Sequence, residues 1–128
     1  MSVRDLCNAY LAALDAGDLD AVLGLFTPGA EVVSPLYGTM PAKDFYAALF
    51  ADTQASDTEL LNVFDSSQDG SAVALHFRYR WTLADGTPVS FEVVDVIELT
   101  AARDAFSKLT IIYDTAPLRG DWAKVHNG

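Results

Sequence analysis

The chain has 128 residues and a 51% apolar composition, which is enough to bury a core, so we expect one domain over residues 1–128 without metal or disulfide support. Its formal net charge of −10 disfavours binding to nucleic acid or to an anionic membrane surface. Because Cys7 is the only cysteine, and no N-terminal segment has the pattern of an export signal or membrane span, we expect a cytoplasmic protein.

The first third of the chain predicts three helices and one short strand. Helix Ser2–Gly17 opens with the serine and aspartate spacing of a capping box, carries apolar residues at helical intervals and ends at a glycine. A shorter helix is predicted over Asp18–Phe26, and Thr27-Pro28-Gly29 closes it. The brief strand Glu31–Ser34 follows. Threonine and proline then have the positions of the cap and first turn of a third helix, Thr39–Phe50.

The rest of the chain predicts a sheet. Turn signals occur at Gln68-Asp69-Gly70 and at Asp85-Gly86-Thr87. The predicted strands are Thr58–Asp65, Ala72–Leu83, Val89–Leu99 and Ser107–Thr115. Helices followed by antiparallel strands are typical of the α+β class, because a parallel sheet needs helices and strands in alternation.

The hairpin formed by the second and third of these strands has one apolar face. Apolar residues occupy the odd positions of both strands, and Asp95 is the one ionisable residue among them. For both odd rows to share a face, paired residue numbers must add up to an even number, which indicates the three-residue loop Asp85-Gly86-Thr87. Phe77 is then predicted opposite Asp95, and Arg80 opposite Glu92 on the outer face.

Asp95 is therefore the first candidate functional residue. Burial disfavours the ionised form of a carboxylic acid, so we expect a raised pKa and a neutral group that donates a hydrogen bond. An unpartnered buried carboxyl is costly and such groups gather at functional sites. The alternatives are that a backbone amide or an arginine satisfies it, or that a register slip turns it to solvent.

Several segments resemble the ketosteroid isomerases, namely Tyr10–Asp20, Leu25-Phe26, Ala30–Pro35, Phe45-Tyr46-Ala47 and Val94-Asp95. The resemblance covers most of the chain and indicates the nuclear transport factor 2-like superfamily, with SnoaL-like polyketide cyclases and limonene epoxide hydrolases. It implies a curved antiparallel or mixed sheet that forms a cone closed by three N-terminal helices. It also implies a homodimer through the outer sheet face. We expect no cofactor, because the sequence has no glycine-rich phosphate loop or nucleotide fingerprint. Independently, the helix and strand order agrees with this fold.

The resemblance assigns roles to three residues. Tyr10 corresponds to the tyrosine that donates to the enolate oxygen, Asp95 to the protonated acid beside it, and Tyr46 to a supporting tyrosine. In ketosteroid isomerases, two such donors stabilise the oxyanion in a dry cavity. Without the resemblance, Tyr10 is an ordinary core aromatic residue on a helix.

The sequence departs from the ketosteroid isomerases at the base. Those enzymes carry an Asp-Pro pair where this chain has Ser34-Pro35, and a serine hydroxyl is too weak a base to take a proton from carbon. We therefore do not expect ketosteroid isomerase activity itself. In many chains a serine before a proline simply begins a turn.

The last predicted strand offers a replacement base. Aligned with the isomerases, it turns Asp114 and Ile112 inward, whereas hydrophobic alternation instead turns Leu109, Ile111 and Tyr113 inward. We follow the alignment, which makes Asp95 and Asp114 an acid and base pair of the kind an aldol cyclisation needs.

Three functions remain open. The first is a pocket enzyme, an isomerase or cyclase for a small apolar steroid- or polyketide-like carbonyl compound. The second is a non-catalytic binding module, and the third is an interaction domain that uses the outer sheet face. Epoxide hydrolysis ranks lower among the chemistries, because Val93 stands where an arginine is needed. The expected pocket wall also includes Ser34, Tyr46, Phe77, Phe91, Val93 and Ile112.

Two further features are less informative. Neither His76 nor His126 has companions at zinc spacing, so we expect no metal. Trp122, in the C-terminal segment, either lies over the mouth of the cone or covers a sheet edge.

Overall fold

A computed structural model describes residues 1–67 and 70–127, with the side chains of residues 126 and 127 left out. The elements in chain order are α1 (Val3–Ala16), α2 (Leu19–Leu23), β1 (Phe26–Ser34), β2 (Gly38–Pro41), α3 (Ala42–Ala51), β3 (Thr53–Asp65), β4 (Ala72–Leu83), β5 (Pro88–Leu99), β6 (Phe106–Ile112) and α4 (Arg119–Asn127). Two of them, β2 and α4, are not predicted from the sequence.

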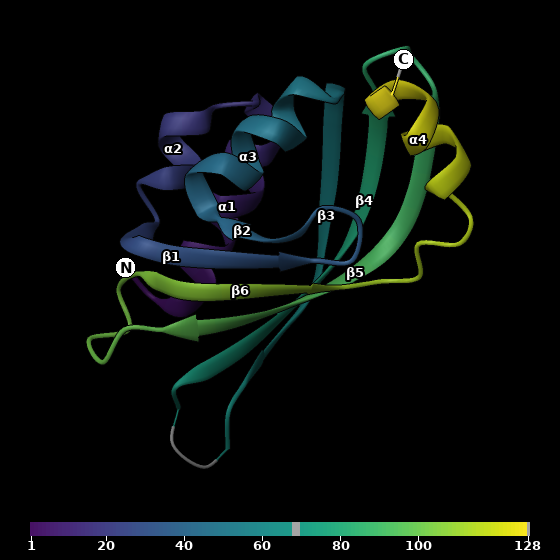
Figure 1. Cartoon of the computed structure of the whole chain (residues 1–128). Coiled ribbons are helices and arrows are strands. Elements are labelled where there is room, and N and C mark those ends of the chain that lie inside the picture. Colours follow the sequence, from purple (N-terminus) through teal and green to yellow (C-terminus); the bar gives the residue numbers. More distant parts are fainter. Residues whose placement is uncertain (68–69, 128) are drawn as a thin grey trace.

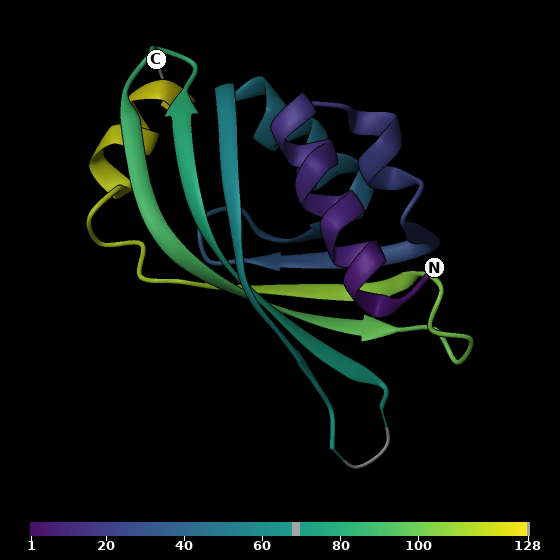
Figure 2. The same cartoon turned by 180° about the vertical axis from the view of Figure 1, so that it is seen from behind.

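The strands form a curved sheet in the order β2-β1-β6-β5-β4-β3. Strands β1 and β6 are parallel and the other pairs are antiparallel, so the sheet is mixed. Helices α1, α2 and α3 lie over its concave face, and α4 lies beside the end that carries the β4–β5 turn (Figure 1). The sheet bends strongly without closing, as the reverse view shows (Figure 2). The expected α+β fold with a curved mixed sheet is confirmed.

Helix α1 forms as its sequence predicts. The Ser2 hydroxyl accepts a hydrogen bond from the Asp5 amide at 3.1 Å, and the Asp5 carboxylate accepts one from the Ser2 amide at 2.9 Å. At the other end Gly17 has φ +63°, a left-handed conformation that suits glycine, and its amide bonds back to the last turn. No described helix is long and apolar enough to cross a membrane.

The region between α1 and α3 differs from the prediction. Helix α2 ends at Leu23, and Phe26 begins β1, because the Phe106 amide donates to the Leu25 carbonyl at 2.8 Å and starts the β1–β6 pairing. The Thr39–Pro41 segment belongs to β2, an edge strand paired with the end of β1. Helix α3 therefore begins at Ala42, after a proline that makes no side-chain cap. Long-range pairing overrides the local helical pattern here.

Strand boundaries also shift. Strand β3 begins at Thr53 rather than Thr58, because its polar first residues pair with the end of β4. Strand β6 covers residues 106–112. It begins one residue before its predicted start and ends three residues before its predicted end. Of the predicted turn over residues 68–70, Gln68 and Asp69 lie outside the described residues.

The β4–β5 hairpin has the predicted faces and a corrected register. Asp95 pairs with Leu75 rather than Phe77, and Glu92 pairs with Arg78 rather than Arg80. The predicted loop length of three is right but the loop lies one residue earlier, over 84–86, because the Leu83 amide donates to the Thr87 carbonyl at 2.9 Å. The resulting shift of two residues keeps every side chain on its face, so the inward odd rows stand.

The outer face of the sheet carries ion pairs. Arg78 bonds Glu59 at 2.8 Å, and Arg80 bonds Asp57 at 2.9 Å, both across the β3–β4 pair. The opposite, concave face packs against α1 and α3 and holds the core.

Candidate functional site

A partly open cavity lies between the concave face of the sheet and helices α1 and α3. It contains about 430 Å³ of empty space, including its mouth, and about 40 Å³ of room for the centres of water molecules. This is room for a few waters or one compact chemical group. Among the described residues, the lining consists of Tyr10, Leu14, Ser34, Tyr37, Phe45, Leu49, Phe77, Tyr79, Trp81, Phe91, Val93, Asp95, Ile111 and Tyr113.

Asp95 is the one carboxylic acid among the described lining residues. Its side chain points inward from the middle of the sheet, between Leu75 on β4 and Ile111 on β6, and the residue is 1% exposed. Neither carboxyl oxygen has a hydrogen-bond partner in the described part of the chain. Burial raises the pKa of Asp95 well above its usual value, which favours the neutral acid, a hydrogen-bond donor.

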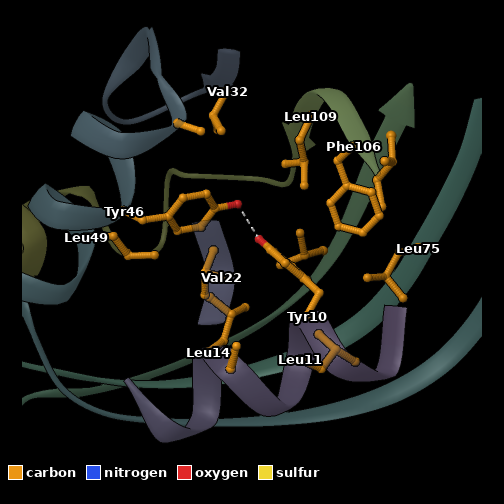
Figure 3. Close-up of a cluster of buried hydrophobic side chains, with 14 of the residues drawn as sticks. Tyr10, Leu11, Leu14, Val22, Val32, Tyr46, Leu49, Leu75, Phe106 and Leu109 are labelled. Atoms are coloured by element: carbon orange, nitrogen blue, oxygen red, sulfur yellow. Dashed lines mark hydrogen bonds between the residues drawn. The ribbon is translucent and has the colours of Figure 1, made fainter. Parts of the chain in front are cut away.

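Tyr10 and Tyr46 form a buried pair of hydroxyl groups beside the cavity. Their oxygens are 2.7 Å apart, and either hydroxyl can be the donor (Figure 3). Tyr10 reaches the cavity from α1, whereas Tyr46 supports it from α3 and does not line the cavity. Burial raises the pKa of both phenols well above the usual value, and the nearby Asp95 carboxyl adds to this. Both tyrosines therefore act as neutral donors or acceptors.

Four other predicted site residues divide in two groups. Phe77, Phe91 and Val93 line the cavity as expected from the odd rows of β4 and β5. Ser34 lies at the end of β1 and also lines the cavity, but its hydroxyl accepts hydrogen bonds from the amides of residues 36 and 37 at 3.2 and 3.1 Å. Ser34 therefore caps the turn that follows β1.

The predicted inward placement of Asp114 is wrong. Asp114 is exposed, and its carboxylate accepts a hydrogen bond from the Ala116 amide at 3.0 Å. Ile112, placed inward by the same alignment, is 53% exposed. Because Ile111 pairs with Asp95 and Leu109 pairs with Ile97, these two residues of β6 share the concave face, and the hydrophobic alternation is the correct guide.

Tyr37 is a lining residue that the sequence does not predict, and Trp122 contacts it. Tyr37 lines the cavity, and its hydroxyl donates a hydrogen bond to the Asp52 carboxylate at 2.6 Å. The Trp122 indole N–H in turn donates to the Tyr37 oxygen at 3.0 Å, and the two rings meet edge to face at 5.3 Å. Trp122 thus ties α4 to a residue of the cavity wall and does not itself line the cavity.

The described residues contain no group of three His, Cys, Asp or Glu side chains that would hold a metal ion. The His126 side chain lies outside the description, and His76 lies on the outer face, where it bonds Asn62 and Glu92 at 3.1 and 2.8 Å.

The profile of the SnoaL-like domain matches residues 7–104, from α1 to the turn after β5. The chain belongs to this SnoaL-like family. No curated protein matches its sequence.

Solved structures share the SnoaL-like fold at low identity. PrhC from Penicillium brasilianum is 14% identical with a TM-score of 0.78, over 96% of this chain and 86% of that one. A protein of ketosteroid isomerase-like fold from Catenulispora acidiphila, in complex with trimethylamine, is 16% identical with a TM-score of 0.74, over 86% and 85%. A putative polyketide cyclase from Pseudomonas putida is 20% identical with a TM-score of 0.72, over 97% of each chain. These comparisons show the fold.

The SnoaL-like cavity thus brings together Tyr10, Ser34, Phe77, Phe91, Val93 and Asp95, with Tyr46 directly behind Tyr10. It leaves out Ile112 and Asp114. The chemistry available is that of one neutral acid and several phenols in apolar surroundings. Such groups can donate hydrogen bonds to a ligand oxygen and stabilise charge that develops on it.

Proposed function

We propose that this SnoaL-like protein binds a small, largely apolar molecule in the cavity, and that Asp95 recognises its polar atom with Tyr10 as the second donor. The two unpartnered oxygens of the buried Asp95 carboxyl carry the proposal. A buried polar group without a partner costs free energy, so native proteins satisfy nearly all of them, and a ligand oxygen would supply the missing bond.

The ligand class is a carbonyl compound or a phenol, and the reaction is proton transfer or cyclisation of the isomerase or cyclase type. A neutral acid that donates to a carbonyl oxygen stabilises the enolate formed when a neighbouring carbon loses a proton. The enclosed part of the cavity has room for the polar end of such a molecule, and the rest of the ligand would extend into the open mouth.

Non-catalytic binding is the second candidate, and the cavity lining favours it for one reason. Within the described residues, Asp95 is the only carboxyl group in the lining, so no separate base faces a ligand that Asp95 holds. The Ser34 hydroxyl, in addition, accepts bonds from two backbone amides. Proton abstraction therefore requires a second role for Asp95 itself or does not occur.

The decisive experiment separates binding from catalysis. The full chain is titrated with phenol, 2-cyclohexenone and trimethylamine, and binding is followed by NMR. Trimethylamine is included because it is bound to the Catenulispora protein. Phenol and cyclohexenone are expected to bind, and Asp95→Leu, which has no donor, to weaken them about 2-fold to 13-fold, the worth of a net hydrogen bond, whereas the amide of Asp95→Asn can still donate. The control Asp114→Asn, which removes a carboxylate outside the cavity, should bind as wild type does. Failure of both oxygen ligands to bind contradicts the proposal.

Catalysis is then measured as exchange of the ketone's α-hydrogens in D₂O. Exchange above the buffer rate that disappears in Asp95→Asn supports the enzyme. Binding without exchange supports the non-catalytic candidate.

We propose that the single domain, residues 1–128, forms a homodimer through the outer face of its sheet. Phe64 on β3 and Ile112 on β6 are 55% and 53% exposed there, and the ion pairs of β3 and β4 lie on the same face. Light scattering should give twice the 13.8 kDa chain mass, and Ile112→Glu should lower it toward one chain because a charge would be buried at the interface.

A further inference from the structure

Aromatic rings form most of the cavity wall. Eight of the 14 lining residues in the described chain are aromatic, and none is lysine, arginine or histidine. Tyr79 and Trp81 are stacked, with centroids 5.9 Å apart and planes 13° apart, and Phe91 and Tyr113 are stacked at 4.5 Å and 24°. Tyr79 meets Phe91 edge to face at 5.6 Å, which joins the four rings into one continuous wall. A single carboxyl group, Asp95, completes this lining.

Aromatic faces attract organic cations, and a carboxylate attracts the same ions. We infer that the cavity takes a small organic ammonium ion, whose alkyl groups lie against the aromatic wall and whose charge is opposite an ionised Asp95. The inference rests on the proposed function, since it uses the same cavity, and it names a ligand class that carries a positive charge.

The number of hydrogen-bond acceptors decides which ammonium ion fits. A primary ammonium group, like that of lysine, has three N–H donors to satisfy. A protonated tertiary amine has one N–H, which matches one Asp95 oxygen, and a quaternary ammonium has none. Metal ions such as Mg²⁺ and Ca²⁺ need about six oxygen ligands, and an aromatic wall with one carboxyl does not provide them. The lining is mostly aromatic, so tertiary and quaternary alkylammonium groups, whose alkyl groups contact apolar walls, are the best match.

The pH dependence of binding distinguishes a cation from a neutral ligand. A cation binds the ionised form of Asp95, so binding releases a proton whenever the free protein holds the acid neutral. The affinity then rises with pH, by up to about tenfold per pH unit, until the pH exceeds the pKa of Asp95 in the free protein. A ligand oxygen that accepts from the neutral acid has the opposite dependence.

The other titratable groups near Asp95 do not contribute to the pH dependence of binding. They are Cys7 and Tyr10 on α1, Tyr46 on α3, Tyr79 on β4 and Tyr113 after β6. Burial raises the pKa of the Cys7 thiol to about 11, and it raises the pKa of each of these phenols above the usual value. All five groups keep their protons between pH 5 and pH 9.

The test compares two molecules of the same shape. Choline and its uncharged carbon analogue 3,3-dimethylbutan-1-ol are titrated into the full chain by calorimetry at pH 6, 7 and 8 and constant ionic strength. Choline is expected to bind at least about tenfold more tightly than the alcohol at pH 8, and to lose affinity as the pH falls. Asp95→Asn should remove most of this preference and all of its pH dependence, whereas Asp114→Asn should retain both. Phe91→Leu should weaken choline by roughly 2-fold to 30-fold and the alcohol less, because a cation–π contact is lost.

Two outcomes overturn the inference. If the alcohol binds as tightly as choline at every pH, the cavity recognises shape alone, and the proposed binding function stands. If neither binds, the inference also falls, and the phenol titration decides whether the proposed function falls with it. Should Asp95→Asn fail to fold, the pH dependence of choline against the alcohol in the wild-type chain separates the same two outcomes.

Discussion

Replacing Asp95 by asparagine should change how stability depends on pH, because the acid is buried and neutral. Above its ordinary pKa of 3.8, the carboxyl of the unfolded chain loses its proton while the folded chain keeps it, since burial raises the pKa in the folded state. Unfolding of the wild type therefore becomes easier as the pH rises. The full slope of one proton is about 1.4 kcal/mol per pH unit, and asparagine has no such term.

The free energy of unfolding is measured by urea titration for wild type, Asp95→Asn and the outer control Asp114→Asn from pH 5 to pH 9. The advantage of Asp95→Asn over wild type should grow with pH by up to about 1.4 kcal/mol per unit, then level off once the pH exceeds the raised pKa. Any constant cost of burying the amide cancels from this slope. A difference that stays flat across the range would refute the burial of a neutral Asp95.

Three further perturbations test other contacts. Tyr46→Phe removes the 2.7 Å bond to Tyr10 and leaves a buried hydroxyl unpartnered, so urea titration should show a loss of about 1–3 kcal/mol. Cys7 is buried, and its pKa is raised to about 11, so a disulfide reagent at pH 8 should label it only as fast as the chain opens; rapid labelling of the folded protein would contradict this. Trp122→Phe keeps a ring but removes the donor to Tyr37, so amide hydrogen exchange in α4 should accelerate while global stability falls by only about 0.5–1.5 kcal/mol.

The sequence predicts those elements whose signals are local. Helix α1 carries its cap, its apolar stripe and its final glycine within 16 residues, from Ser2 to Gly17. The start of β1 could not be predicted this way, because Leu25 and Phe26 continue a helical pattern and are drawn into strand pairing by Phe106. Only the partner strand, far along the chain, distinguishes the two outcomes.

The candidate site divides along the same line. Asp95 can be placed from alternation alone, since one odd position breaks an apolar row and the row is buried. The alignment of the last strand with the isomerases misplaces Asp114, whereas the strand's own alternation agrees with the pairing of Ile111 with Asp95. The bonds from Trp122 to Tyr37 and from Tyr37 to Asp52 join three distant segments and leave no pattern in the sequence.

The corrected position of Asp114 also changes how the cavity should be understood electrostatically. With two carboxyls inside, each would have set the charge of the other, and the site would have contained both an acid and a base. With Asp95 as the only carboxyl in the described lining, the occupant sets its charge. A ligand oxygen keeps the acid protonated and uses it as a donor, whereas an ammonium ion displaces the proton and pairs with the carboxylate. The two ligand classes proposed for this cavity therefore select the two protonation states of one residue, and they compete most sharply near the pKa of Asp95 in the free protein.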